Sequence, residues 1–316
     1  MNKRIWVCAV MFALLAGCGR KELPAVNTDA LDPASFDATN AFREVKRFVG
    51  LGPKDAGTPG GANAAFYLHS RLKAMGAETS TDEFVDEAPK GPVKFRNVIG
   101  RIPGKGDGVI ILAGHYDTKS GMKKGFEGAN DGGSSSGVLL ELARLITEAG
   151  RAGKLGRTVL IVFFDGEECM VHYGPQDGLH GSRHMASRLV KEDRAREVKG
   201  VIVLDMIGDK DLTVTLPLNS TPFLVSSLFN AAHAENARGR FSLYPFEVGD
   251  DHDPFLKAGM PAIDIIDFRY GSERNLNDYW HTEHDRMDRI SADSLGMVGR
   301  VTLRMLNDLL KVFLQQ

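Results

Sequence analysis

Short apolar runs alternate with longer amphipathic stretches along most of the chain. The short runs are bounded by Gly, Pro or polar residues, as β-strands usually are, and they lie at residues 97–102, 109–113, 158–164, 201–204 and 262–266. Apolar residues recur at the spacing of one helix face at residues 42–49, 62–75, 135–148, 181–191, 221–237 and 294–313. The alternation predicts a single α/β domain with a mostly parallel central sheet flanked by helices.

Composition and charge are those of an ordinary folded protein. The 316 residues carry a formal net charge of −2, with 43% hydrophobic and 25% charged residues, which is too apolar for a disordered chain. This charge balance gives no reason to expect nucleic acid as a partner, and we expect the protein to be a monomer. Cys169 is the only cysteine after residue 18, so the body of the chain cannot form an internal disulfide.

The N-terminus has the pattern of a bacterial lipoprotein signal. Lys3 and Arg4 precede an uncharged apolar run at residues 5–15, which is too short to span a bilayer comfortably. The letters LAGC follow at residues 15–18 and resemble the lipobox, where bacterial lipoproteins are cleaved before a cysteine that then carries lipid. The alternatives are a plain signal peptide and a buried N-terminal strand.

This pattern predicts the organisation of the whole chain. We expect a signal peptide at residues 1–17, a lipid anchor on Cys18, a polar tether over residues 18–39 and one folded domain over residues 40–316. The protein would then belong to the bacterial cell envelope, anchored in a membrane and facing the periplasm or the cell surface. Several acyl chains on one cysteine would hold it there stably.

Acidic residues and histidines gather where the predicted strands end. In parallel α/β sheets, sites lie beyond the carboxyl ends of the strands, so side chains from distant segments can converge there. The residues that follow strands or lie in the neighbouring loops are His115, Asp117, Asp131, Glu167, Glu168, Asp205, Asp250 and His281. Imidazole and carboxylate donors of this kind suit zinc with one position left open for chemistry.

The adjacent pair Glu167-Glu168 is the sharpest of these signals. Two carboxylates directly after a buried strand are costly unless a cation or a proton compensates them. One of them could bind a metal while the other acts as a general base. Taken singly, His115 could be a core histidine, Asp131 a helix N-cap and Asp205 a turn former, and Asp117 is expected to orient His115 rather than to bind metal.

Several sequence blocks resemble the M28 zinc aminopeptidase superfamily over residues 42–313. The blocks are AGHYDT, GANDGGSSSG, FFDGEE, LDMIG, DDHDPFLKAGMPAID and WHT. Within that superfamily, residues 163–186 (FFDGEECMVHYGPQDGLHGSRHMA) resemble the glutaminyl cyclases, because the aminopeptidases have a much shorter connection at this point. The resemblance implies a zinc aminopeptidase-like catalytic domain over residues 40–316. The implied enzyme is a glutaminyl-peptide cyclotransferase, which converts the N-terminal Gln of peptides or proteins to pyroglutamate and releases ammonia.

The resemblance also implies roles for individual residues. The implied ligands of one zinc ion are Asp131, Glu168 and His281. Glu167 would be the general acid and base, with Asp205 and Asp250 in a hydrogen-bonded carboxylate network near it. Trp280 would form a wall of the substrate pocket, and Tyr173 stands in that wall where the animal cyclases have a tryptophan. The chain also departs from those cyclases at Asp264 (their histidine) and at Gly114 and Ser136 (their disulfide cysteines).

Two other functions remain open from the sequence. In the aminopeptidase pattern, His115 and Asp205 would hold a second zinc ion, with Asp131 bridging the two ions. All of these residues are present, so ligand identity does not separate a cyclase with one zinc ion from an aminopeptidase with two. A catalytically silent peptide-binding protein is the third reading.

Overall fold

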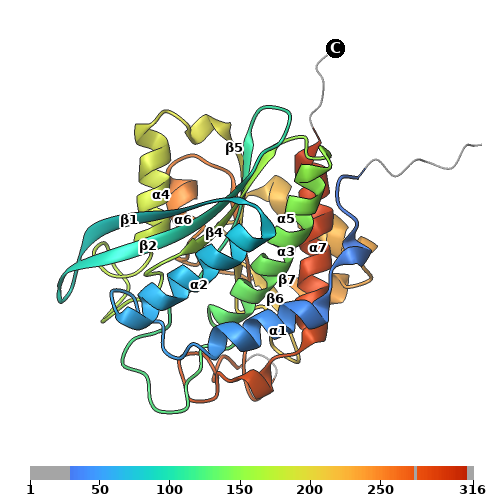
Figure 1. Cartoon of the computed structure of the whole chain (residues 1–316). Helices are drawn as coiled ribbons and strands as arrows, with labels where there is room; N and C mark the ends of the chain where they lie inside the picture. Colours follow the sequence, from blue (N-terminus) through green and yellow to red (C-terminus); the bar gives the residue numbers. More distant parts are fainter. Residues whose placement is uncertain (1–28, 274–275, 312–316) are drawn as a thin grey trace, which may run out of the picture.

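Four parallel strands form one side of a six-stranded sheet, and two antiparallel strands extend its other side (Figure 1). The computed structural model describes residues 29–273 and 276–311. The strand order is β1-β2-β4-β3-β5-β8, and β4, β3, β5 and β8 are mutually parallel. The bounds are β1 Glu78–Ala88, β2 Gly91–Ile102, β3 Val109–His115, β4 Thr158–Phe164, β5 Val198–Asp205 and β8 Ala262–Ile266. The prediction of a mostly parallel α/β sheet is confirmed.

Helices cover both faces of the sheet (Figure 1). The helices on one face are α1 Ala38–Val49, α2 Pro59–Met75, α3 Gly133–Arg151, α5 Pro222–Ala234 and α7 Ala292–Leu310. The other face carries α4 His180–Lys191 and α6 Asp253–Lys257. A small parallel pair, β6 Val214–Leu216 and β7 Phe241–Leu243, lies outside the main sheet.

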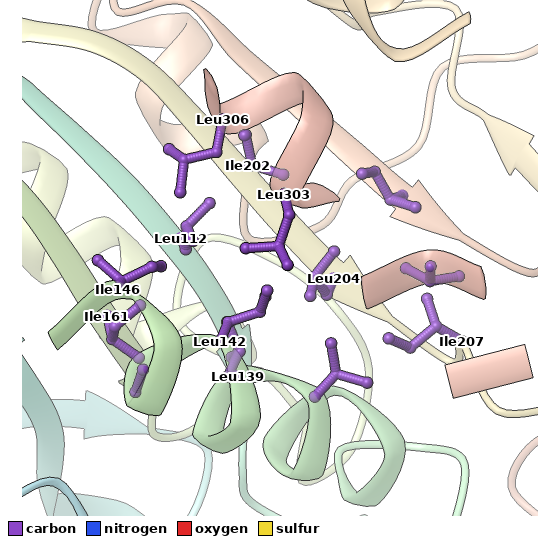
Figure 2. Packing of buried hydrophobic residues seen from close by; sticks show 14 of the residues in the cluster. Leu112, Leu139, Leu142, Ile146, Ile161, Ile202, Leu204, Ile207, Leu303 and Leu306 are labelled. Atoms are coloured by element: carbon purple, nitrogen blue, oxygen red, sulfur yellow. The ribbon is translucent and has the colours of Figure 1, made fainter. Parts of the chain in front are cut away.

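The alternation of side chains along the strands separates two apolar cores. Ile110 and Leu112 of β3 point into the larger core, where α3 and α7 contribute residues such as Leu142 and Leu303 (Figure 2). Ile111, between them in the chain, points into the smaller core under α4 and α6. Successive residues of a strand face opposite sides, so strands buried on both sides must be apolar throughout, as their sequence indicates.

The structure differs from the predicted elements at one sheet edge and in the bounds of two helices. Strand β1 was not predicted, because its sequence ETSTDEFVDEA is mostly polar and mostly exposed, and it forms an edge strand paired only with β2. The helix predicted over residues 135–148 is longer at both ends, since α3 runs from Gly133 to Arg151. The prediction of a helix over residues 221–237 was also too long, since α5 ends at Ala234.

The expected tether ends earlier than residue 39. Leu31 and Phe36 are buried against the larger core, and the main chain of Leu31 makes two hydrogen bonds with the side-chain amide of Asn307 in α7 (3.0 and 2.7 Å). Residues 29–39 therefore belong to the folded domain. The predicted signal peptide, Cys18 and residues 18–28 lie outside the described residues. Among the residues that are described, no helix is long and apolar enough to cross a membrane.

Candidate metal centre and active site

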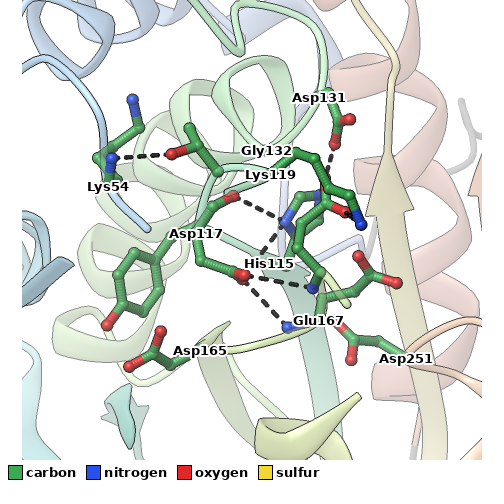
Figure 3. A network of polar contacts seen from close by, with 12 residues as sticks. Lys54, His115, Asp117, Lys119, Asp131, Gly132, Asp165, Glu167 and Asp251 are labelled. Atoms are coloured by element: carbon green, nitrogen blue, oxygen red, sulfur yellow. Dashed lines mark hydrogen bonds and ion pairs between the residues drawn. The ribbon is translucent and has the colours of Figure 1, made fainter. Parts of the chain in front are cut away.

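The carboxyl ends of three neighbouring strands carry the predicted site. His115 is the last residue of β3, and Asp205 is the last residue of β5. Glu167 and Glu168 follow the end of β4 after two intervening residues. Since β4, β3 and β5 lie side by side and run parallel, these side chains meet at one edge. Asp131, just before α3, reaches the same place, and Figure 3 shows His115, Asp131 and Glu167 close together.

Two groups of three metal-ligating side chains share Asp131. The ligand atoms of Asp131, Glu168 and His281 lie within 4.8 Å of one another, and so do those of His115, Asp131 and Asp205. His281 Nε2 lies 2.9 Å from Glu168 Oε1 and 3.3 Å from Asp131 Oδ2. His115 Nε2 lies 3.1 Å from Asp131 Oδ1 and 3.2 Å from Asp205 Oδ1. Each oxygen of Asp131 thus faces a different histidine.

The electrostatics of the first group fit a divalent cation. Burial, together with the charge of Asp131, raises the pKa of Glu168 to about 7. Burial alone would lower the pKa of His281, but its hydrogen bonds with Asp131 and Glu168 raise it to about 10. Two buried carboxylates and a partly buried histidine therefore depend on one another's opposite charge. A divalent cation can replace the imidazole proton there, since metal ligation requires neutral imidazole and ionised carboxylates. Two carboxylates and one imidazole leave the fourth position of tetrahedral zinc open.

The backbone is strained at two points beside these groups. His281 has a φ of 54° and Met206, which follows Asp205, has a φ of 46°. Non-glycine residues seldom adopt this left-handed conformation, and where they do, the surrounding structure must stabilise it. One of these positions is a candidate metal ligand and the other directly follows one, and such strain commonly occurs at functional sites.

Asp117 orients the site, partly as predicted. Its main-chain carbonyl accepts a hydrogen bond from His115 Nδ1 (3.1 Å), which leaves Nε2 free toward Asp131 and Asp205. Its carboxylate lies farther from that ring, at 3.6 Å, and accepts the backbone N–H groups of Glu167 and Glu168 at 3.1 and 3.2 Å (Figure 3). One buried aspartate therefore fixes both a histidine and the acidic pair.

Replacing Asp117 with Asn tests this positioning role. The asparagine amide has only one acceptor oxygen, so one of the two N–H groups of the acidic pair would face an NH₂ group. We expect Asp117→Asn to weaken zinc binding or turnover by about 10–100-fold, as the loss of partners behind metal ligands usually does. Zinc titration and steady-state kinetics on the variant measure both. Unchanged zinc affinity with unchanged turnover would contradict the role.

Glu167 belongs to neither group of metal-ligating side chains, although it is buried beside them. Burial raises the pKa of Glu167 well above its usual value, and the charges of Asp250 and Glu168 add to the effect. Burial and the charge of Asp205 raise the pKa of Asp250 to about 7. Asp264, the residue that replaces a histidine of the animal cyclases, is fully buried beside Asp250, and burial and that charge raise its pKa strongly. The buried carboxylates of Glu167, Asp205, Asp250 and Asp264 therefore lie close enough to influence one another's pKa.

Two aromatic residues border the acidic pair and the histidine. The Tyr173 hydroxyl lies 3.1 Å from Glu167 Oε2 and 3.2 Å from Glu168 Oε2, so its single proton is shared between two acceptors. Trp280 stacks on His281 with ring centroids 4.1 Å apart. Tyr173 therefore contacts the acidic pair, and Trp280 contacts the candidate ligand His281.

Some sequence-based interpretations were wrong. Asp131 is not a helix N-cap, because the cap of α3 is Gly132 and no side chain caps it. Asp205 is not a turn former: it ends β5, and its carboxylate contacts His115. The Asp131 side chain contacts both His115 and His281, and the Asp205 side chain contacts His115.

Two site residues were missed by sequence reasoning. Asp285 is fully buried and accepts hydrogen bonds from the N–H groups of Asn130 and Asp131 (2.8 and 3.2 Å) and from the Tyr270 hydroxyl (3.0 Å). Lys119 Nζ lies 3.7 Å from Glu168 Oε2 and 5.4 Å from the centroid of the Tyr173 ring. Their nearness in sequence to the WHT and AGHYDT blocks is the only signal that could have indicated them.

A family model described as "Peptidase family M28" matches residues 97–306. The chain belongs to peptidase family M28. One similar protein is the glutaminyl-peptide cyclotransferase of Drosophila melanogaster, 25% identical over 274 residues that cover 79% of this chain and 76% of that protein. The glutaminyl cyclase of an Acidobacteriales bacterium has a similar solved structure, with a TM-score of 0.81 and 36% identity, covering 92% of this chain and 99% of that one.

Solved peptidase structures are similar as well. A leucine aminopeptidase precursor from Bacteroides thetaiotaomicron has a TM-score of 0.76 and 26% identity, covering 88% of this chain and 99% of that one. The predicted M28 fold and the resemblance to glutaminyl cyclases are therefore both confirmed. Cyclases and peptidases therefore share this fold.

Proposed function

We propose that this M28 protein is a zinc-dependent glutaminyl-peptide cyclotransferase. The observation that carries the proposal is the segment after the acidic pair, where the sequence resembles the cyclases. The Asp177 carboxylate accepts the N–H groups of Met170, Val171 and His172 (2.6, 2.8 and 2.9 Å), which closes the segment into a compact loop. This loop places the Tyr173 hydroxyl on Glu167 and Glu168. Similar proteins named as cyclotransferases support the same activity.

The residues of the site can be assigned to the steps of this reaction. Asp131, Glu168 and His281 would hold one zinc ion, which when bound supplies Lewis acidity toward the γ-carbonyl oxygen of an N-terminal glutamine. Glu167 accepts a proton from the α-amine as that nitrogen attacks the γ-carbonyl carbon. The new C–N bond closes the five-membered ring, and the bond to the amide nitrogen breaks. Glu167 then returns its proton to the departing nitrogen, which leaves as ammonia.

The surrounding residues favour this use of Glu167. Its raised pKa, caused by burial and by Asp250 and Glu168, brings the carboxyl closer to the range in which one group can both accept and release a proton at neutral pH. The Tyr173 hydroxyl and the Asp117 carboxylate hold its side chain and its main chain in place. Trp280, beside His281, offers a flat apolar surface for the substrate residue.

One paired assay tests the proposal. Purified, zinc-loaded protein is incubated with a Gln-initiated peptide and, separately, with a chromogenic amide of leucine. We expect release of ammonia with a pyroglutamyl product from the first substrate and no free leucine from the second. Free leucine without pyroglutamate would contradict the cyclotransferase activity and support a peptidase. No product from either substrate would contradict both enzymatic activities and favour a peptide-binding protein.

A two-zinc M28 aminopeptidase is the second candidate function. It is favoured by one observation, the second group formed by His115, Asp131 and Asp205, whose ligand atoms also lie within 4.8 Å of one another. Two ions bridged by Asp131 would suit the generation of hydroxide from water. The cyclase needs no such hydroxide, because its nucleophile is the amine of the substrate, and one ion is enough.

We also propose that the protein is lipid-anchored through Cys18 at the bacterial cell envelope, in the periplasm or at the cell surface. The support is the sequence pattern at residues 3–18, and peptide or protein N-termini in that compartment would be the substrates. Cys18→Ser is expected to move the protein from the membrane fraction to the soluble fraction, as judged by fractionation and immunoblotting. An unchanged distribution would argue against the anchor.

A further inference from the structure

A line of aromatic rings runs from the candidate metal ligand His281 to the surface. Trp280 stacks on His281, and the Phe268 ring meets Trp280 edge to face with centroids 6.4 Å apart. Tyr244 stacks on Phe268 at 5.7 Å, and Phe246 meets Tyr244 edge to face at 5.6 Å. We call Trp280, Phe268, Tyr244 and Phe246 the aromatic strip.

The outer end of the strip is exposed but held in place. Phe246 is 64% exposed and its neighbour Leu218 is 63% exposed, although burial of such side chains would each be worth about 1.5–3 kcal/mol. The Leu218 N–H donates to the Phe246 carbonyl (2.9 Å). The Asn219 side chain makes two hydrogen bonds with the main chain of Val248 (3.0 and 3.2 Å). An ordered backbone thus presents apolar side chains to solvent.

The strip contacts the candidate site at its inner end, where Trp280 stacks on His281. Phe246 lies four residues before Asp250 of the carboxylate cluster, and Trp280 directly precedes His281. A peptide whose N-terminal residue reacts at this site must run outward from it. An extended chain advances about 3.3–3.6 Å per residue, and successive rings of the strip are 5.6–6.4 Å apart, so the strip can accompany several residues.

We propose that the aromatic strip binds apolar side chains of the substrate residues that follow the N-terminal glutamine, and so determines which peptides are preferred. The inference rests on the proposed cyclotransferase activity and names its substrate class: chains with an aromatic or large aliphatic residue shortly after the glutamine. Aromatic contacts of this geometry contribute about 0.5–1.5 kcal/mol beyond the buried area, which is enough to separate substrates. The reacting groups lie elsewhere, so the strip contributes affinity and selectivity.

A peptide series with one variant and one matched control tests this. The parent is a Gln-Ser-Ser-Ser-Ser amide, and four further peptides carry a single Phe at position 2, 3, 4 or 5. In the wild-type protein we expect Phe at one or more positions to raise kcat/KM at least 5-fold, mainly through KM. Phe246→Ser should remove that gain. Phe66→Ser, at a 74% exposed phenylalanine of α2, should retain it.

The outcomes separate this inference from the proposed function. Cyclisation of all five peptides with equal kcat/KM, or a gain that survives in both Phe246→Ser and Leu218→Ser, would overturn the role of the strip and leave the cyclotransferase intact. No cyclisation of any Gln peptide would overturn both. A change in oligomeric state of Phe246→Ser on size-exclusion chromatography, with peptide selectivity unchanged, would assign the strip to contact between copies of the chain and overturn the inference.

Discussion

Glu167→Gln is expected to lower kcat by about 10²–10⁴-fold, the usual contribution of a positioned general acid and base. Glutamine keeps the size of the side chain but cannot accept or return the proton that passes from the substrate amine to ammonia. Glu167 is not among the candidate metal-ligating groups, so the zinc content should stay at the wild-type level. Ammonia release and elemental analysis of the same preparation measure the two properties.

The neighbouring residue provides a matched control. Glu168→Gln makes the same chemical change one position later, but it removes a carboxylate that lies 2.9 Å from His281 Nε2. We therefore expect Glu168→Gln to lose zinc together with activity, whereas Glu167→Gln loses activity alone. A Glu167→Gln protein that turns over normally, or that loses its zinc, would refute the separation of base from ligand.

His281→Ala is the second change with a large expected effect. It removes the only nitrogen donor of the group with Asp131 and Glu168 and leaves two buried carboxylates of like charge without a cation. Catalytic zinc sites use three protein ligands, so the loss of one of the three should lower zinc affinity by at least 100-fold and turnover with it. Isothermal titration with zinc and the ammonia assay measure both.

The sequence supplies a control for this variant three residues away. His284 is exposed, and its ring contacts Tyr279 rather than the carboxylates of the site. His284→Ala should bind zinc and turn over substrate as the wild-type protein does. Equal losses in both variants would indicate a general disturbance of the loop, and no loss in His281→Ala would contradict its role as a ligand.

The parts of the fold that could be predicted from sequence are those in which burial dominates. Strands β4 and β8 have the predicted bounds, because strands covered on both faces must be apolar along their whole length. Strand β1 could not be predicted in this way, since its partner is β2 alone and its side chains are mostly exposed. The end of the tether was misjudged because the contact that orders Leu31 is with Asn307, 276 residues later.

The same division holds for the site. His115, Glu167 and Asp205 could be placed together because parallel strands end at one edge of the sheet. The carboxylate of Asp117 supports the backbone of the acidic pair, which depends on how two loops pack and not on any local pattern. The aromatic strip likewise joins residues 244–246 to residues 268–280, and only the folded chain brings those segments into contact.

Anomalous diffraction at the zinc edge, from crystals of the zinc-loaded protein, tests the metal centre most directly. An equally strong second peak between His115 and Asp205 would favour the two-zinc aminopeptidase over the cyclase. For a cyclotransferase with one zinc ion we expect one dominant peak per chain, within bonding distance of the Asp131 carboxylate, the Glu168 carboxylate and His281 Nε2. Zinc-loaded crystals without a peak inside that group would contradict it.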